Sequence, residues 1–159
     1  MIFRRKDRRM GDPRYGFSYI SFKNRSGKGV SLNTQSKAIP KKILVIDDDR
    51  GILEVLEAIL EYRGFEVVTD NGESIQRKIV KYIPDLILMD ISLGRNNGSL
   101  ICNDLKNDPM TKNIPVILIS AHNNLQNYPQ INQADDFIAK PFDMKELLNK
   151  ISGLLTVNT

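Results

Sequence analysis

The sequence from Lys41 onward predicts an α/β fold, a doubly wound sheet of parallel strands with helices on both faces. Apolar runs of strand length at 43–46, 86–89 and 116–119 contain only Ile, Leu, Val and Met, which is typical of strands buried on both faces. These runs alternate with segments of helical periodicity, which favours βα units joined by right-handed crossovers. Each run also ends in a polar residue, and open parallel sheets bind ligands at the carboxyl ends of their strands.

The composition is that of an ordinary water-soluble domain. The 159 residues are 41% hydrophobic and 26% charged, and the single cysteine, Cys102, excludes an internal disulfide. No stretch has the roughly 18 uninterrupted apolar residues of a membrane span, and no apolar segment follows the charged N-terminus as in a secretory leader. We therefore expect a cytoplasmic protein with no membrane partner.

Charge divides the chain into two parts. Residues 1–42 hold twelve Lys or Arg and two Asp or Glu, a net charge of +10, whereas residues 43–159 hold eleven and seventeen, a net charge of −6. This asymmetry predicts a basic, flexible arm over residues 1–40 and an acidic folded domain over residues 41–157.

One stretch of the arm differs from the rest of it. Aromatic residues alternate with others between Tyr15 and Phe22, and a turn-like cluster follows. A basic strand with such aromatics can stack nucleobases, so nucleic acid is a candidate partner of residues 1–40. The alternative is a flexible tail or a fortuitous hairpin, which we favour because an RNA-binding domain needs about twice this length.

The first half of the domain is predicted to form two βα units. A strand at 42–47 precedes a helix that Asp49 can cap and Gly64 can end. A strand at 65–69 and a turn lead to a second helix that ends before Pro84. Helical spacing is kept by these residues: Ile52, Val55, Leu56, Ile59 and Leu60 in the first helix, and Ile75, Ile79 and Tyr82 in the second.

The second half continues this alternation. Strands are expected at 86–90, 116–120 and 136–139, and helices at 98–107 and 143–155. Leu100, Ile101 and Leu105 are expected to face inward from the helix at 98–107. The polar segment 123–132 has few helical markers, although the alternation places the fourth helix there. The order implies five βα units and no second folded domain.

Three carboxylates gather at the expected strand ends, together with a hydroxyl and a lysine. Asp47 and Asp48 follow the first strand and Asp90 ends the third, and carboxylates this close repel one another unless a cation lies among them. Oxygen ligands without a nearby histidine or cysteine favour Mg²⁺. Ser120 can donate a hydrogen bond, and Lys140 suits phosphate oxygens. The set predicts phosphoryl transfer to a carboxylate. Each residue alone is more often structural than functional, and three aspartates after a strand are often only a turn and a helix N-cap.

These segments resemble the receiver domains of two-component response regulators over residues 41–157. The resemblance is carried, in the family's order and spacing, by ILVIDDD, LILMD, VILIS and FIAKPF. It implies a flavodoxin-like (βα)5 fold with strand order 2-1-3-4-5, of the stand-alone type. It also implies a phosphoacceptor that a histidine kinase or a histidine phosphotransfer protein phosphorylates, and that signals to a downstream protein effector.

The resemblance further implies roles for the matched residues. Asp90 would be the phosphoacceptor and Lys140 its phosphate-contacting lysine. The Mg²⁺ ligands would be Asp47, Asp48, Asp90 and the backbone carbonyl of Ser92. Ser120 and Phe137 would form the switch, which changes the face of the fourth helix and fifth strand between residues 121 and 142. Such a chain catalyses its own phosphorylation and dephosphorylation and is not otherwise an enzyme.

Some positions match the family closely and others depart from it. Gly98 matches the glycine after the phosphoacceptor strand, and Lys140-Pro141 is expected to be a cis peptide. Gly94 stands where proline is usual, and Phe137 lacks the hydroxyl of the commoner tyrosine. His122 either tunes access to Asp90 or is an exposed loop residue, and Cys102 is expected in the core.

Two rival functions remain beside the phosphoacceptor switch. A Mg²⁺-dependent phosphatase can also place an aspartate nucleophile at a strand end, but it would need further acids and usually a cap domain. A nucleic-acid-binding protein could act through the basic arm under the control of the domain.

Overall fold

The computed structural model describes residues 15–23, 29–37, 39–121 and 133–157, and the chain divides into two compact units at Pro40. The first unit contains strands β1 (Tyr15–Lys23) and β2 (Gly29–Lys37). They pair antiparallel over their full length, from Tyr15 opposite Lys37 to Lys23 opposite Gly29. The structure therefore describes a hairpin within the segment for which the composition favours a flexible arm.

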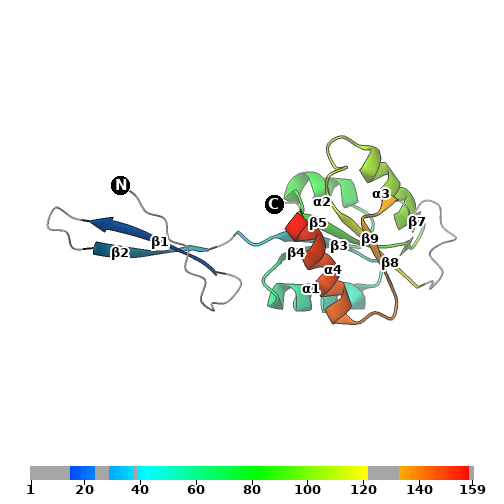
Figure 1. Cartoon of the computed structure of the whole chain (residues 1–159). Coiled ribbons are helices and arrows are strands. Elements are labelled where there is room, and N and C mark those ends of the chain that lie inside the picture. Colours follow the sequence, from blue (N-terminus) through cyan, green and yellow to red (C-terminus); the bar gives the residue numbers. More distant parts are fainter. Residues whose placement is uncertain (1–14, 24–28, 38, 122–132, 158–159) are drawn as a thin grey trace. The chain divides into compact units, whose positions relative to one another are not determined.

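The second unit is built on a five-stranded parallel sheet (Figure 1). Its strands are β3 (Lys42–Ile46), β4 (Glu66–Asp70), β5 (Leu86–Asp90), β8 (Val116–Ser120) and β9 (Asp136–Ala139). They lie in the order β4-β3-β5-β8-β9, with every neighbouring pair parallel. Numbered along the domain this order is 2-1-3-4-5, so the predicted doubly wound, flavodoxin-like topology is confirmed.

Helices cover both faces of the sheet, as the uninterrupted apolar strands predict. On one face, α1 (Arg50–Tyr62) and α4 (Met144–Val157) bury Leu56, Leu60 and Ile151 against the sheet. On the other, α2 (Ile75–Tyr82) and α3 (Gly98–Asn107) bury a second cluster that includes Ile79 and Cys102. Alternate strand residues serve the two cores, so the strands β3, β5 and β8 are fixed in register and depth.

The helix that follows β3 begins and ends where its sequence predicts. The Asp49 side chain accepts hydrogen bonds from the N–H groups of Gly51 and Ile52, at 2.7 and 3.3 Å. Gly64 follows the helix with φ +89°, a left-handed conformation that glycine adopts without steric cost. Because α1 starts immediately after the aspartates, its cap fixes the backbone that carries them.

One face of α3 differs from the sequence-based expectation. Leu100 is 49% exposed, so the expectation that Leu100 faces inward is wrong. The buried stripe of α3 runs instead through Gly98, Cys102 and Leu105, which are spaced four and three residues apart as one helix face requires.

The loop after β5 contains a short hairpin that its sequence did not predict. Its strands are β6 (Ser92–Leu93) and β7 (Asn96–Asn97). The expected fourth helix at 123–132, and His122, lie outside the described residues. Among the described residues, no helix is long and apolar enough to cross a membrane.

Candidate functional site

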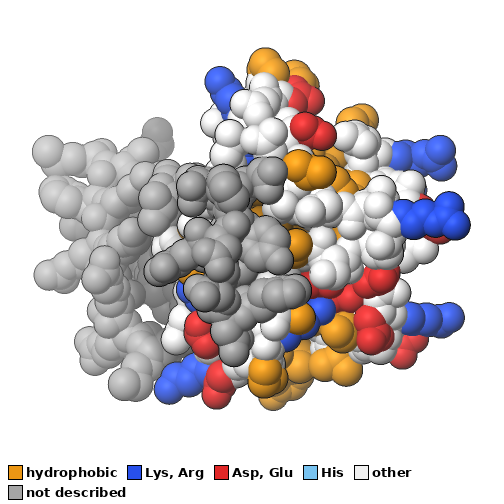
Figure 2. Space-filling model, turned by 90° about the vertical axis from the view of Figure 1, so that its right-hand side faces the viewer, with side chains coloured by type: hydrophobic (Ala, Val, Ile, Leu, Met, Phe, Trp, Pro, Cys, Tyr) orange, Lys and Arg blue, Asp and Glu red, His pale blue; other side chains and the backbone are white. Residues whose placement is uncertain are grey.

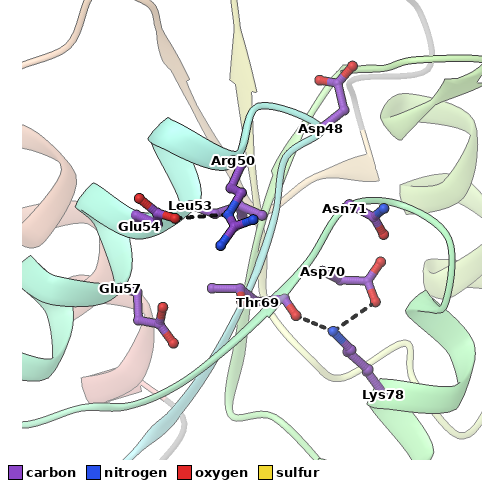
Figure 3. Close-up of a pocket in the computed structure, with 9 residues that line it drawn as sticks. All are labelled: Asp48, Arg50, Leu53, Glu54, Glu57, Thr69, Asp70, Asn71 and Lys78. Atoms are coloured by element: carbon purple, nitrogen blue, oxygen red, sulfur yellow. Dashed lines mark hydrogen bonds and ion pairs between the residues drawn. The ribbon is translucent and has the colours of Figure 1, made fainter.

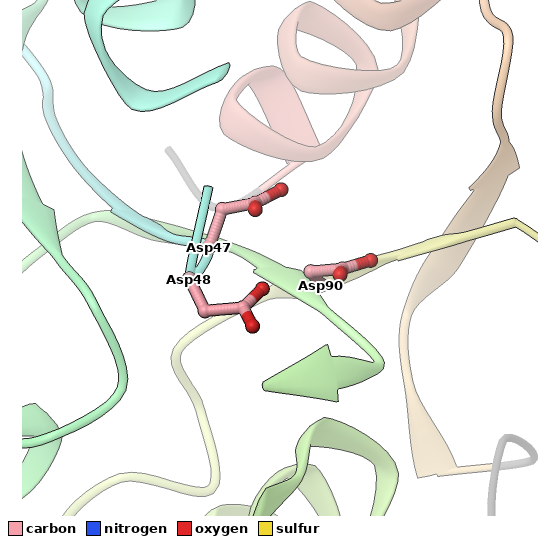
Figure 4. A group of neighbouring side chains, drawn as sticks. All are labelled: Asp47, Asp48 and Asp90. Carbon is pink, nitrogen blue, oxygen red and sulfur yellow. The ribbon is translucent and has the colours of Figure 1, made fainter. Parts of the chain in front are cut away.

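Three aspartates converge at the carboxyl ends of two neighbouring strands. Asp47 and Asp48 follow β3, and Asp90 is the last residue of β5, which pairs with β3. One carboxylate oxygen from each lies within 4.8 Å of the other two, and Figure 4 shows the three side chains around one point. Asp47 and Asp90 are buried, whereas Asp48 is exposed, so the group is open to solvent on one side.

The donor set of this group fits a hard divalent cation. It offers only carboxylate oxygens, and Mg²⁺ prefers oxygen ligands and keeps several waters. The buried members need charge compensation, and the exposed Asp48 leaves room for water. The family resemblance adds the backbone carbonyl of Ser92 to this set. Ser92 is the first residue of β6 and follows Asp90 by two positions.

Lys140 reaches the same point from the end of β9. Its Nζ lies 2.9 Å from Asp47 Oδ2 and 3.3 Å from Asp90 Oδ1. Burial would lower the pKa of Lys140, but its hydrogen bond to Asp47 and the charge of Asp90 outweigh this and raise the pKa above its usual value. Lys140 is therefore a fixed positive charge between the two buried carboxylates.

The electrostatics of Asp90 differ from those of an isolated carboxylate. Burial raises the pKa of Asp90; Lys140 opposes this increase, and the charges of Asp47 and Asp48 add to it. The position of the Asp47 side chain is fixed at both oxygens, since Oδ2 pairs with Lys140 and Oδ1 accepts the Asp49 N–H at 2.9 Å. Without a cation, the site thus disfavours the ionised form of the very carboxylate at its centre.

Ser120 lies on β8, the strand next to β5, and Phe137 lies on β9, the edge strand beyond it. Ser120 ends β8 and is buried, and its backbone carbonyl accepts the Lys140 N–H at 2.6 Å. Phe137 lies on β9 with 48% of its surface exposed. Lys150 Nζ lies 5.8 Å from the centroid of the Phe137 ring and 2.8 Å from Asp136 Oδ1. A cation at this distance from an aromatic ring attracts it. Lys150 of α4 therefore holds the Phe137 ring in its outward position, and Asp136 of β9 holds Lys150 in turn.

Gly98 permits the close packing of α3 against the loop that follows Asp90. A Cβ at this position would lie 2.1 Å from the Asp90 carbonyl oxygen and 3.1 Å from the Ile91 Cα. The Gly98 N–H donates to the Ile91 carbonyl at 2.8 Å. Gly94, in the same loop, has φ +56°. The loop after Asp90 is therefore shaped by two glycines, one for space and one for conformation.

Asp70 is a buried acid that the sequence pattern placed only in a turn. Its carboxylate accepts from the Gly72 N–H at 2.7 Å and from the Ser74 hydroxyl at 2.6 Å, and pairs with Lys78 at 3.2 Å. Burial would raise the pKa of Asp70, but the hydrogen bonds from Ser74, Gly72 and Lys78 outweigh it and lower the pKa. The signal for this arrangement is the spacing of Asp, Gly and Ser, which is typical of an Asx turn.

A polar groove of about 490 Å³ connects this network with the aspartate cluster. Figure 3 shows Asp48 at one end of it and Asp70 with Lys78 at the other. Lys78 also donates to the Thr69 carbonyl, and Arg50 pairs with Glu54 at 2.9 Å. Both cations of the groove are thus paired with groups that line it.

A second groove, of about 500 Å³, lies on the other side of the cluster. It is mainly apolar and runs between α1 and the segment after β9. Its lining includes Lys140 at the end near the aspartates and Val55, which is 57% exposed. Figure 2 views the molecule from the side on which the strands end, and acidic side chains gather there beside exposed apolar ones. The site is therefore bordered by a surface that a protein partner could contact.

The family model of the response regulator receiver domain matches residues 43–152. Among characterised proteins, the chain is 36% identical over 117 residues to the DNA-binding dual master transcriptional regulator RpaA of Synechocystis, covering 72% of this chain and 48% of that protein. It is 35% identical over 120 residues to the phosphate regulon transcriptional regulatory protein PhoB of Pseudomonas aeruginosa, covering 74% and 52%. The chain spans about half the length of the curated relatives it matches.

Solved structures give the same result. A response regulator from Chloroflexus aurantiacus has a TM-score of 0.69 at 30% identity, covering 74% of this chain and 99% of that one. The response regulator TrrA of Thermotoga maritima, solved in complex with Mg²⁺ and BeF, has a TM-score of 0.66 at 30% identity, covering 72% and 98%.

Proposed function

The chain belongs to the response regulator receiver domain family, and on this basis we propose that it is a switch whose phosphoacceptor is Asp90. The donor would be the phosphohistidine of a histidine kinase or of a histidine phosphotransfer protein. The observation that carries the proposal is the position of the Asp90 carboxylate, at the end of the central strand and 3.3 Å from Lys140. The site would operate in the cytoplasm.

In the proposed transfer, an Asp90 carboxylate oxygen attacks the phosphorus. The new O–P bond forms as the P–N bond to the donor imidazole breaks, and the leaving nitrogen keeps the electron pair. Lys140 lies where it can bind an oxygen of the transferred group while remaining close to Asp47. Asp47, Asp48, Asp90 and the Ser92 carbonyl would hold Mg²⁺, which supplies charge neutralisation for the phosphoryl oxygens.

We propose that Ser120 and Phe137 convert this charge into a change of surface. The Ser120 hydroxyl would bind a phosphoryl oxygen, and the Phe137 ring would turn inward into the space that Ser120 leaves. Burying the remaining half of the ring is worth about 1 kcal/mol, since complete burial is worth 1.5–3 kcal/mol. Leaving Lys150 costs roughly 0.5–1 kcal/mol. The outward and inward positions of the Phe137 ring are thus nearly equal in free energy, and a modest bias from the phosphoryl group would shift their populations.

The apolar groove beside Lys140 is the proposed docking surface for the donor protein. An apolar groove of this kind can accept the apolar face of a helix, and its lysine lies at the phosphoacceptor. Val55→Glu should therefore reduce phosphorylation by a phosphohistidine protein while leaving phosphorylation by acetyl phosphate unchanged. Equal loss with both donors would contradict this docking surface, because acetyl phosphate needs no protein contact.

The direct test of the phosphoacceptor uses acetyl phosphate, Mg²⁺ and phosphoprotein gel retardation. Asp90→Asn should remove labelling because an amide of the same shape is not a comparable nucleophile. Asp104→Asn, an exposed aspartate on α3, serves as the matched control and should be labelled as wild type. Labelling of Asp90→Asn at the wild-type level would refute the assignment, and multiple turnover of phosphate esters would favour the rival phosphatase.

The output of the switch would be read by a downstream effector. The surface expected to change is the face of β9 and the rest of residues 121–142, the range in which the sequence predicts the fourth helix. Amide exchange in the described part of this range, with and without phosphorylation, should report the change in wild type. Ser120→Ala should keep Asp90 labelling and lose the response; a full response would refute the coupling.

A further inference from the structure

The turn between β4 and α2, residues 70–74, contacts two of the segments that surround the aspartate cluster. The Asp70 carbonyl accepts the backbone N–H of Asp47 at 3.1 Å, so the last residue of β4 holds the backbone at one of the buried carboxylates. Two residues further along, Gly72 lies against the hairpin of β6 and β7, which follows Asp90. We call residues 70–74 the β4–α2 turn.

The contact between the β4–α2 turn and this hairpin has an apolar part and a polar part. A Cβ on Gly72 would lie 3.6 Å from the Leu93 Cβ, and Leu93 is buried in the same core cluster as the start of α2. The Gly72 carbonyl accepts the Asn96 side-chain N–H at 3.4 Å. Because Leu93 directly follows Ser92 and pairs with Asn96 in the hairpin, a displacement of the turn would also displace the Ser92 carbonyl.

The Asp70 side chain fixes the conformation of the turn. One carboxylate oxygen accepts the N–H groups of Gly72 and Ser74 at 2.7 and 3.3 Å, and the other accepts the Ser74 hydroxyl at 2.6 Å. Lys78 pairs with the same carboxylate (Figure 3). Gly72 has φ +95°, a conformation that glycine adopts without steric cost. These bonds are enough to begin α2, so the contacts of the turn with Asp47 and with the hairpin are additional to that role.

We propose that Asp70 and Ser74 are positioning residues for Mg²⁺, which act by holding the Asp47 backbone on one side and the Ser92 carbonyl on the other. The inference rests on the proposed function, in which Asp47 and Ser92 provide ligands to the ion. Groups that orient metal ligands from outside the coordination sphere typically change metal affinity by 10–100-fold when they are removed. The β4–α2 turn orients two ligands from two strands at once.

The test titrates the isotope-labelled full-length chain with Mg²⁺ and follows its amide chemical shifts, which requires no phosphorylation. Ser74→Ala removes the hydroxyl that donates to Asp70 and leaves every charge near the cluster in place. We expect its Kd for Mg²⁺ to rise about three- to ten-fold, which corresponds to the loss of one ordinary hydrogen bond. An effect of charge alone predicts no change.

A second variant tests the same contact from the side of the hairpin. Asn96 is exposed, so Asn96→Ala removes the hydrogen bond to Gly72 without opening the core. Its Kd for Mg²⁺ should rise about three-fold, at the lower end of the range because the hydrogen bond is long. In the metal-free protein, both Ser74→Ala and Asn96→Ala should speed amide exchange of residues 92–97 by a similar factor.

Each variant has a matched control at a distance from the cluster. The Thr111 hydroxyl donates to the Leu105 carbonyl at 2.7 Å, between α3 and β8, so Thr111→Val removes a hydroxyl bond comparable with that of Ser74. The exposed Asn107 side chain donates to the Asn103 carbonyl at 2.8 Å, so Asn107→Ala matches Asn96→Ala. Both controls should bind Mg²⁺ within about two-fold of wild type, because neither contacts the turn or the hairpin.

Labelling by acetyl phosphate provides a further readout. Ser74→Ala should need more Mg²⁺ than wild type for half-maximal labelling, but should reach the wild-type rate at saturating Mg²⁺, because the bound ion itself restores the positions of its ligands. A wild-type chain that binds Mg²⁺ but is not labelled would refute the proposed phosphoacceptor, whereas the titrations would still decide the role of the turn.

Three outcomes would overturn the proposal. These are a Kd for Ser74→Ala and Asn96→Ala equal to that of wild type, an equal loss of affinity in the variants and their controls, and no binding of Mg²⁺ to wild type. The second would identify general destabilisation as the cause. Weaker Mg²⁺ binding by both variants, with both controls unchanged, supports it.

Discussion

Substitution of Gly98 by alanine should disturb both the stability of the domain and the position of Asp90, the proposed phosphoacceptor. The added Cβ would lie 2.1 Å from the Asp90 carbonyl oxygen, where real Cβ contacts are essentially never below 3.0 Å. The backbone must therefore move by at least 0.9 Å. Its nearest neighbours are backbone atoms, which cannot rotate away as the end of a side chain can.

The expected cost follows from these contacts. Overpacking typically costs 1–3 kcal/mol, and weakening the hydrogen bond from the Gly98 N–H to Ile91 adds about 1 kcal/mol. A loss of about 2–4 kcal/mol corresponds to a fall in Tm of roughly 10 °C for a domain of this size. The shift of the Asp90 backbone should also slow labelling by acetyl phosphate.

Gly153→Ala is the matched control. Gly153 lies within α4, and nothing lies within 4 Å of the position of its added Cβ. Alanine in an unobstructed helix interior should therefore raise stability by about 0.5–1 kcal/mol. Calorimetry of both variants decides the issue, and a Tm for Gly98→Ala at or above that of wild type would refute the steric argument.

Three other perturbations test the electrostatics. Millimolar Mg²⁺ should raise Tm by relieving carboxylate repulsion, and Asp48→Ala should lose most of this increase; an unchanged increase would place the metal elsewhere. The pKa of Asp70 is lower in the folded state than in the unfolded chain, where it is about 3.9. Asp70 therefore stabilises the fold at pH values above about 3.9, and this contribution is lost as the pH falls towards the folded pKa. Asp70→Asn should therefore flatten the acid side of the stability profile in urea titrations. Lys150→Met should free the Phe137 ring and shift its NMR signals towards the phosphorylated state, whereas Lys145→Met, an exposed lysine of the same helix, should not.

Local patterns in the sequence account for most of the fold. Continuous apolar strands, the Asp49 cap and the breaks at Gly64 and Pro84 were sufficient to predict the five parallel strands and the helices of the described residues. The strand order depended on the family resemblance. Signals of this kind depend on residues that are close in the sequence, so they can be recognised without knowledge of the tertiary contacts.

Features that depend on tertiary packing were harder to predict. The inward face of α3 was misassigned at Leu100 because Gly98 brings the helix so close to the sheet that the small residues face inward. The hydrogen-bond network of Asp70 was missed because its partner Lys78 lies on the following helix, α2, and contacts Asp70 only through the tertiary fold. At the site, the sequence indicated the aspartates and Lys140, but not the position of Lys150 over Phe137, which depends on the packing of α4 against β9.

The two outer strands of the sheet bear on aggregation. An edge strand exposes backbone groups that can recruit a strand from another chain. On β9, which has only four residues, the Phe137 N–H donates to its neighbour Asp136 at 2.8 Å. On β4, the Thr69 carbonyl accepts from Lys78. On each outer strand, a charged side chain is thus hydrogen-bonded to a backbone group that could otherwise pair with another chain. The domain should therefore resist strand addition and domain swapping even at high concentration.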